Sequence, residues 1–509
     1  MSKKLILVVI DGAKPAMLDR TVADGRAPIL ELLIDRGTYV RDVVAVFPSV
    51  TPVCAASIVT GVGQDRHLIP SMNWFHRGEG RYVEYGSSFR ASRRFGLARQ
   101  LTDTIYNMNR AHLAADELTI FESLDDAGIR TAGTTYLMYR GRFRHEPSLE
   151  TPLTRFASRT LIRHPVMGPR ELFYADIFAS RETGCRGLVG MPGIRDQHSG
   201  CVGTYLVEHD LFDFMLLSLP DNDAHSHKHG PHAQVDSIAF ADTQLARLVD
   251  AAGGPQAFLA DHAVIVVADH AHGAIERSIS LADELADFPT LQPSDSRPEN
   301  AEIAVCPAQR SAMIYLLGDG HARLEEIVAR ARSIAGVDLV MWREDSFDGR
   351  LAVLAGDRGE LRFAPGEDVR DLRGRRWHVT GSPETVDGRI DGGVFRSDHY
   401  PDVLGRVWDA LACPTSGEIL LSTAPAYEFC DWGGGHHVGG GSHGSLHSSD
   451  SLAPLIYTGL DGAPPLDREQ WSIKDIAPLV LGHFGLSPAS IGPGREGSTA
   501  ATTSPVAPA

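Results

Sequence analysis

Three short and almost uninterrupted apolar runs constrain the fold of this chain more than any other feature. They occupy residues 5–10, 212–219 and 263–268, and Val, Ile, Leu, Phe and Ala dominate them. Runs of this length without regular polar alternation are typical of parallel strands that are buried on both faces. The fold is therefore predicted to be α/β, with a doubly wound, mostly parallel central sheet that has helices on both faces.

Each apolar run is followed by a loop that carries acidic or histidine side chains. The side chains concerned are Asp11, Asp221, Asp223, His227, Asp269 and His270. Ligands of open α/β sheets bind outside the carboxyl ends of the strands, so these side chains are expected to converge on one site. Taken singly, they could be turn aspartates, an exposed histidine-rich loop or a buried salt bridge. Their repetition at three strand ends favours a shared site.

The spacing of Asp223 and His227 is one that metal ligands use. A carboxylate and a histidine four residues apart can lie on one face of a helix and reach the same ion. Asp221 is the alternative carboxylate, because it lies nearer to the end of the apolar run. Sequence alone favours Asp223 without excluding Asp221.

A further histidine, His443, stands in the glycine-rich segment GGGSHGS. Glycines permit unusual backbone angles and let the chain approach a site closely. His436, His437 and His447 compete for the same role. A mixed set of aspartates and histidines suits two divalent cations, with zinc the first choice and manganese or iron the alternatives.

Thr51 stands at the expected start of a helix. It is predicted to be the N-cap and Pro52 the first helical residue of a helix that runs to about Thr60 and is closed by Gly61. The N-terminus of a helix favours an anion such as phosphate. A metal ion beside the hydroxyl could lower its pKa, which would make Thr51 a nucleophile.

The chain is long enough for a catalytic core with insertions. The core is expected in three parts, at residues 1–63, 206–307 and 431–485. Residues 64–205 are predicted to be insertions that cover the active site, with no regular element expected within residues 136–205. Residues 308–430 are predicted to be an α+β insertion. Residues 486–509 are rich in Pro, Gly, Ser, Ala and Thr and are predicted to be a disordered tail.

Composition bears on partners and on the compartment. The formal net charge is −17, which disfavours stable nucleic-acid binding. The apolar run at residues 5–10 is too short for a signal peptide, and no stretch is long enough to cross a membrane. The six cysteines form no CxxC pair, so they are expected to be reduced thiols in a cytoplasmic protein. The sequence indicates no oligomeric state.

The motifs occur in an order that resembles the alkaline phosphatase superfamily. In chain order they are VVIDG, FPSVTPVCAASIVTG, DAHSHKHGP, ADH and GSHGS. Within that superfamily the chain is most similar to the type I phosphodiesterase/nucleotide pyrophosphatase branch, which includes phosphonoacetate hydrolase. The resemblance covers about residues 4–62, 210–275 and 430–485.

The resemblance implies roles for individual residues. In that branch the nucleophile is a threonine nine residues before the Thr of a Thr-Gly pair, as Thr51 stands before Thr60. The implied ligands of one cation are Asp223, His227 and His443. The implied ligands of the second cation are Asp11, Thr51, Asp269 and His270.

The chain departs from the pattern of this branch in two places. Relatives often have an asparagine three residues after the nucleophile that helps to stabilise the developing charge, and this chain has Cys54 there. The usual Asp-His-Gly is replaced by Asp269-His270-Ala271-His272-Gly273, so His272 is a competing ligand.

The first insertion supplies candidate substrate contacts. The rings of Trp74 and Tyr85 could stack on a flat substrate group, although they could equally form the small core of the insertion itself. Arg93 could instead clamp a phosphomonoester. Cys54 is the remaining candidate, because of its position after Thr51.

These observations predict a metal-dependent hydrolase of phosphodiester or pyrophosphate bonds that acts on a small phosphoester through a phosphothreonine-type intermediate. The same site would also serve a phosphomonoesterase, a phosphonate hydrolase or a phosphosugar mutase. A metal-stabilised binding protein is the alternative without activity. The complete set of candidate ligands argues against that alternative.

Overall fold

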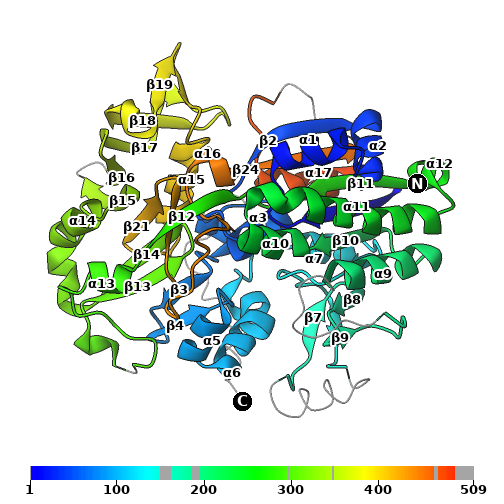
Figure 1. The fold of residues 1–509 in the computed structure, drawn as a ribbon, viewed down its shortest axis with the longest axis horizontal. Helices are drawn as coiled ribbons and strands as arrows, with labels where there is room; N and C mark the ends of the chain where they lie inside the picture. The colour runs from blue at the N-terminus through cyan, green and yellow to red at the C-terminus, as the bar shows by residue number, and fades with distance from the viewer. Residues whose placement is uncertain are drawn as a thin grey trace.

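An eight-stranded sheet forms the centre of the computed structural model (Figure 1). The structure describes residues 2–148, 162–185, 195–295, 297–346, 349–462 and 468–487. The strand order is β2-β24-β11-β1-β10-β5-β8-β9. The strands are β1 (Lys4–Ile10), β2 (Thr38–Val44), β5 (Thr131–Gly133), β8 (Glu171–Tyr174), β9 (Phe178–Ala179), β10 (Phe214–Leu219), β11 (His262–Val267) and β24 (Leu452–Thr458).

Most neighbouring strands of this sheet run in the same direction. β1 pairs in parallel with both β10 and β11, and β5 pairs in parallel with β10 and β8. β24 is antiparallel to β11 and β2, and β9 is antiparallel to β8. The predicted mostly parallel central sheet is confirmed.

Helices cover both faces of the sheet, as the continuous apolar character of β1 predicts. Leu5, Leu7 and Val9 belong to one core, and the alternate residues Ile6 and Val8 belong to a second core. The first core includes α3 (Thr51–Thr60), α7 (Ile120–Asp126) and α17 (Ile476–His483). The second includes α1 (Pro15–Ala23), α2 (Pro28–Arg36), α9 (Arg195–Glu208), α11 (Gln234–Ala251) and α12 (Pro255–Asp261).

A second, nine-stranded sheet lies beside the first and is almost entirely antiparallel (Figure 1). Its strands are β13 (Ile303–Ala308), β14 (Ser311–Leu316), β15 (Val337–Ser346), β16 (Gly349–Gly356), β17 (Gly359–Arg370), β18 (Arg376–Gly381), β19 (Gly388–Asp391), β20 (Val394–Ser397) and β21 (Ile419–Thr423). Helix α14 (Leu324–Arg332) shares a core with it. Residues 308–430, which are predicted to be an α+β insertion, supply all of this sheet except most of β13.

Residues 136–205 contain more regular structure than the sequence predicts. β8 joins the central sheet there, and most of α9 also falls within this range. Two glycines in α9 weaken its intrinsic helix propensity, which hides the helix from sequence inspection. One of them, Gly200, lies against α11, where an added Cβ would be 2.4 Å from Oε1 and 2.9 Å from Cβ of Gln244. Tertiary contact therefore overrides propensity here.

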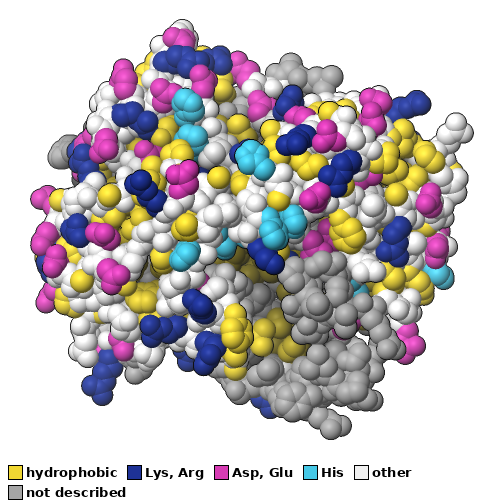
Figure 2. Space-filling model, viewed as in Figure 1, with side chains coloured by type: hydrophobic (Ala, Val, Ile, Leu, Met, Phe, Trp, Pro, Cys, Tyr) yellow, Lys and Arg dark blue, Asp and Glu magenta, His cyan; other side chains and the backbone are white. Residues whose placement is uncertain are grey.

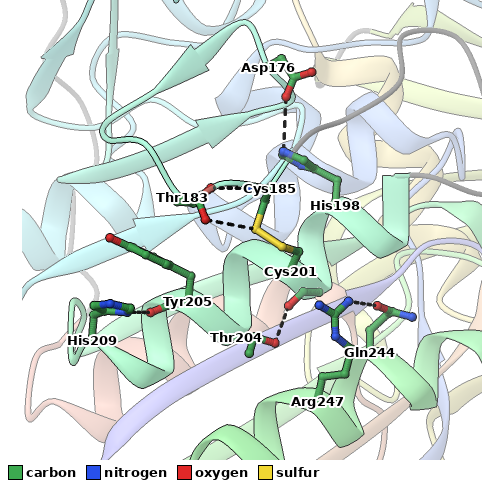
Figure 3. The surroundings of a disulfide bond; sticks show 11 residues. Asp176, Thr183, Cys185, His198, Cys201, Thr204, Tyr205, His209, Gln244 and Arg247 are labelled. Carbon is green, nitrogen blue, oxygen red and sulfur yellow. Dashed lines mark hydrogen bonds and ion pairs between the residues drawn. A yellow bond between two sulfur atoms is a disulfide. The ribbon is translucent and has the colours of Figure 1, made fainter. Parts of the chain in front are cut away.

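The cysteine prediction is wrong for one pair. Cys185 and Cys201 form a disulfide that joins the segment after β9 to α9 (Figure 3). The two residues are 16 positions apart and come together only because α9 packs beside the sheet, so no local sequence motif predicts the disulfide. Disulfides persist in oxidising surroundings, so cysteine usage no longer argues for a cytoplasmic protein. The other four cysteines are free thiols.

On the face in Figure 2, acidic and basic side chains are interspersed. Among the described helices, none combines the length and the apolar composition that a membrane crossing requires. The predicted disordered tail lies outside the described residues from residue 488 onward.

Candidate functional site

The candidate site lies at the carboxyl ends of three adjacent parallel strands. β1, β10 and β11 are neighbours in the sheet, and each ends at the same edge. Asp11 follows β1, helix α10 (Asp221–His229) follows β10, and Asp269 and His270 come shortly after β11. The sheet therefore brings together the side chains that the sequence places at three separate positions.

Asp223 lies at the centre of one group of ligand atoms. It occupies the first turn of α10, one helical turn before His227. Its Oδ1 is 3.3 Å from Nε2 of His227, 3.4 Å from Nε2 of His443 and 2.9 Å from Nε2 of His272. One ligand atom from each of the four residues lies within 4.8 Å of those of the others, so they could hold a metal ion.

Asp221, the alternative carboxylate, is engaged elsewhere. Its Oδ2 accepts the backbone N–H of Asp196 at 3.0 Å, and its own N–H donates to Asp196 Oδ1 at 2.9 Å. Its Oδ1 is 3.3 Å from Nε of Arg195. Asp221 thus holds the start of α9, whereas Asp223 faces the histidines.

Three of the imidazoles are oriented by backbone carbonyls. Nδ1 of His227 contacts the Gly441 carbonyl at 2.8 Å, and Nδ1 of His443 contacts the Ser49 carbonyl at 2.8 Å. Nδ1 of His270 contacts the carbonyl of Ala271 at 3.3 Å. A carbonyl can only accept, so the proton of each neutral ring sits on Nδ1 and the Nε2 lone pair is left for a cation.

The second group surrounds the Thr51 hydroxyl. Nε2 of His270 is 3.3 Å from Thr51 Oγ1, 3.4 Å from Asp269 Oδ2 and 3.7 Å from Asp11 Oδ1. Asp11, Asp223 and His270 form a second set that could hold a metal ion. Asp269 Oδ1 accepts the N–H groups of Gly12 and His270, which fixes the carboxylate at the strand end.

Thr51 occupies a different helix position from the predicted one. The N-cap of α3 is Val50, so Thr51 is the first helical residue, and the contact recorded for its hydroxyl is with His270. Pro52 has no N–H, and the N–H groups of Val53 and Cys54 donate to the Val50 carbonyl. Fewer backbone amides are therefore free for an anion than the sequence suggests. The predicted helix end is confirmed, with Gly61 in the left-handed region.

Among the described residues, the carboxylates of the site, Asp11, Asp223 and Asp269, form no ion pair with a lysine or an arginine. Burial, together with the nearby Asp269 and Asp223, raises the pKa of Asp11, and burial raises the pKa of Asp269 to about 6. Burial opposes ionisation of Asp223 too, but the surrounding histidines lower its pKa.

This arrangement fits divalent cations. Lone pairs of Nε2 atoms face carboxylate oxygens, and the Oδ1 atom of Asp11 is buried without a hydrogen-bond partner among the described residues. Buried acceptors that face one another repel unless a cation lies between them. The donor set is the mixture of imidazole and carboxylate that zinc binds.

Two of the expected substrate contacts, the aromatic rings of the first insertion, are buried in the structure. Trp74 and Tyr85 are 1% and 4% exposed, and both rings belong to the hydrophobic core. The Tyr85 hydroxyl contacts Nδ1 of His112 at 2.7 Å. In this structure neither ring has a free face for a substrate, so the alternative of an internal core is the better interpretation.

Arg93 and Cys54, the other two expected substrate contacts, have different surroundings. Arg93 lines a surface hollow with other arginines, and that hollow includes none of the candidate ligands. Cys54 lies in α3 three residues from Thr51, but it is fully buried. Burial raises its pKa, which leaves a neutral thiol.

Two residues near the site carry little sequence signal. His272 appears in the sequence only as a competitor of His270, yet it contacts Asp223 more closely than any other histidine. Tyr136 follows β5 and has a buried hydroxyl with no hydrogen-bond partner among the described residues. Its pKa is raised by burial and then by Asp269 and Asp11, which places it near the same strand ends.

Comparison with known proteins identifies the family. The model of the type I phosphodiesterase/nucleotide pyrophosphatase family matches residues 5–359. The chain belongs to this family. It is therefore an enzyme, a phosphoric ester hydrolase of the phosphodiesterase/nucleotide pyrophosphatase type. No curated protein sequence matches the chain.

Solved structures of this fold include enzymes from distant sources. Phosphonoacetate hydrolase of Sinorhizobium meliloti 1021, solved with phosphonoformate, has a TM-score of 0.55 and 19% identity, over 95% of this chain and 96% of that one. Murine ectonucleotide pyrophosphatase/phosphodiesterase 5 has a TM-score of 0.54 and 13% identity, over 96% of both chains. These likenesses support the alkaline phosphatase-like fold predicted from the motifs.

Proposed function

We propose that this family member hydrolyses phosphodiester or pyrophosphate bonds of a small substrate, with Thr51 as the nucleophile and two divalent cations. One observation carries the proposal. Lone pairs of imidazoles and buried carboxylates converge around the Thr51 hydroxyl, and no lysine or arginine of the described residues pairs with those carboxylates.

The candidate ligands divide into two sets. Asp223, His227 and His443 would hold one cation. Asp11, Thr51, Asp269 and His270 would hold the other. Zinc suits these donors best, with manganese or iron as alternatives. Bound divalent cations would lower the pKa of a hydroxyl and stabilise negative charge on phosphoryl oxygens.

The protein's own groups would carry the covalent steps. Nε2 of His270 lies 3.3 Å from Thr51 Oγ1 and orients the hydroxyl. The Thr51 oxygen would form a bond to phosphorus while the bond to the leaving group breaks, and the hydroxyl proton would end on the departing alcohol or phosphate. Water would then cleave the Thr51 phosphoester, which releases the phosphate product and restores the hydroxyl.

The diester preference rests on the described residues, among which no lysine or arginine pairs with the candidate ligands. A monoester carries two charges on the transferred group and calls for an arginine on its non-bridging oxygens. Arg195 is the arginine whose charge acts on Asp11, and it contacts Asp221 rather than the ligand groups. A structure of the murine relative described as inactive holds AMP and carries a threonine-to-alanine change, which supports a threonine nucleophile here.

The test compares a bis-aryl phosphate with the matching mono-aryl phosphate. kcat/KM for both would be measured at one pH on zinc-loaded protein, on chelated protein and on Arg195→Ala. We expect the diester to be preferred, chelation to abolish both activities, and Arg195→Ala to leave the diester activity close to normal. A monoester preference that disappears in Arg195→Ala would overturn the diester proposal while leaving the two-cation site in place.

A further inference from the structure

We propose that His272 is a fourth protein ligand of the cation bound by Asp223, His227 and His443, an inference that rests on the proposed function. The ring is fully buried, and its Nε2 is 2.9 Å from Asp223 Oδ1, closer than that of His227 or His443. The usual Asp-His-Gly motif of the family has no histidine at the position that follows Asp269-His270-Ala271.

His272 lies about as close to the other candidate ligands as they lie to one another. Its ring centroid is 4.7 Å from that of His227 and 4.9 Å from that of His443. Ligand atoms of all four residues lie within 4.8 Å of one another, which is the crowding that a single central ion requires. A histidine that only supported Asp223 from behind would not need to face the other two imidazoles.

The residue after Asp11 leaves room for this approach. Gly12 has φ +66°, and a Cβ there would lie 2.7 Å from Nε2 of His272 and 3.4 Å from Asp223 Oδ1. Any larger residue would push the imidazole away from the carboxylate. The N–H of Gly12 donates to Asp269, so the same residue links the two ligand groups.

A fourth ligand makes the two cation positions unequal. Three imidazoles and one carboxylate fill the tetrahedral set of zinc, as in sites that hold the metal permanently. Catalytic zinc sites usually keep one position open. The set around Thr51 offers mainly oxygen, with His270 as the single imidazole. We therefore expect the Asp223 position to retain zinc more tightly than the Thr51 position.

Direct counting of imidazoles tests the inference without any activity measurement. The metal-free full-length protein would be loaded with one equivalent of zinc, and X-ray absorption would count the histidine ligands. We expect three imidazoles on zinc in the native protein and two in His272→Gln. Two imidazoles in the native protein would overturn the inference while leaving the proposed function intact. A native protein that takes up no zinc would contradict the proposed function itself.

Affinity measurements on matched variants supply the second readout. A glutamine at this position keeps an N–H that can reach Asp223 but is a poor zinc ligand. His272→Ala and His272→Gln are both expected to weaken the tighter zinc site by about 100-fold or more in competition with a chelator, beyond the usual loss from an outer contact. His232→Ala, which changes an exposed histidine after α10, should leave affinity unchanged.

The glutamine variant shows whether His272 binds the cation or only donates a hydrogen bond to Asp223. Native affinity in His272→Gln with loss only in His272→Ala would show that His272 merely donates to Asp223, and it would overturn the proposal. Native affinity in both variants would overturn it as well.

Discussion

Two aspartates of the first turn of α10 have different surroundings, and at the scale of single residues this difference can be tested directly. Asp223 Oδ1 faces three imidazole nitrogens, whereas Asp221 contacts Asp196 and Arg195 at the start of α9. Asp223→Asn is expected to lose one of the two bound cations, as measured by elemental analysis of the purified protein.

Asp221→Asn is the matched control for that substitution. It removes a carboxylate from the same helical turn but should keep the full metal content. Loss of metal in Asp221→Asn with retention in Asp223→Asn would reverse the assignment.

Alanine substitutions at two glycines distinguish the cost of backbone strain from the effect of crowding at the site. Gly12 and Gly25 have nearly the same positive φ, +66° and +69°, but a Cβ on Gly25 would meet nothing within 4 Å. Both Gly→Ala variants should lose about 1–2 kcal/mol of unfolding free energy from the left-handed backbone. Only Gly12→Ala should also weaken zinc binding, because its Cβ would collide with His272.

Calorimetric titration of zinc into both metal-free variants checks this expectation. Equal zinc affinity in the two alanine variants would contradict the role given to Gly12.

At the scale of elements, the disulfide fixes the segment after β9 to α9. In Figure 3 the bonded sulfurs lie between the Thr183 turn and the helix. A cross-link that closes a loop of this length is worth about 3 kcal/mol. Cys201→Ser is expected to lower the free energy of unfolding in urea by about that amount.

The control for the disulfide is Cys430→Ser, which changes a free thiol and should have a small effect. Reducing agent should weaken the native protein but not Cys201→Ser. Equal stability of the native protein and Cys201→Ser without reductant would mean that the bond is absent.

Asp242 of α11 joins that helix to the start of α2. Its carboxylate accepts the N–H groups of Leu30 and Ile29, yet burial raises its pKa to about 6. In the unfolded chain the Asp242 carboxyl loses its proton at about pH 3.9. The protonated carboxyl therefore adds its full contribution to the free energy of unfolding below that pH, and the contribution is lost as the pH rises to about 6. The loss should amount to about 2–3 kcal/mol.

Urea unfolding of the native protein and of Asp242→Asn at a series of pH values measures the contribution of this carboxyl to the free energy of unfolding. The stability advantage of the native protein over the variant should shrink between pH 4 and 7. Asp236→Asn, which changes an exposed carboxylate on the same helix, should show a difference of less than about 0.5 kcal/mol. A pH-independent gap for Asp242→Asn would contradict the raised pKa.

At the scale of the whole molecule, the central sheet could be predicted because its information is local. The apolar runs specify buried parallel strands, and parallel strands end at one edge, which brings Asp11, Asp223 and Asp269 together. Their ligand roles stay predictions. The approach of His272 depends on space beside Gly12, which lies 260 residues away in the chain and leaves no local pattern.

The burial of the aromatic rings in the first insertion is harder to predict from the sequence than the central sheet is. Aromatic clusters look alike whether they stack on a ligand or fill a core. Phe75 packs edge-on against Tyr315 of the second sheet, and Tyr82 packs against Trp432. These partners lie more than 200 residues further along the chain, so only the tertiary structure reveals that the rings are already covered.

The most direct test of the central claim is the turnover of Thr51→Ala on a phosphodiester, with zinc content measured in the same preparation. Thr51 is not the N-cap of α3, so the variant should fold with an unfolding free energy within about 1 kcal/mol of the native value. We predict a fall in kcat of roughly 10⁴- to 10⁶-fold, in line with losses of nucleophiles elsewhere. Near-normal turnover by Thr51→Ala with its full complement of zinc would contradict the account.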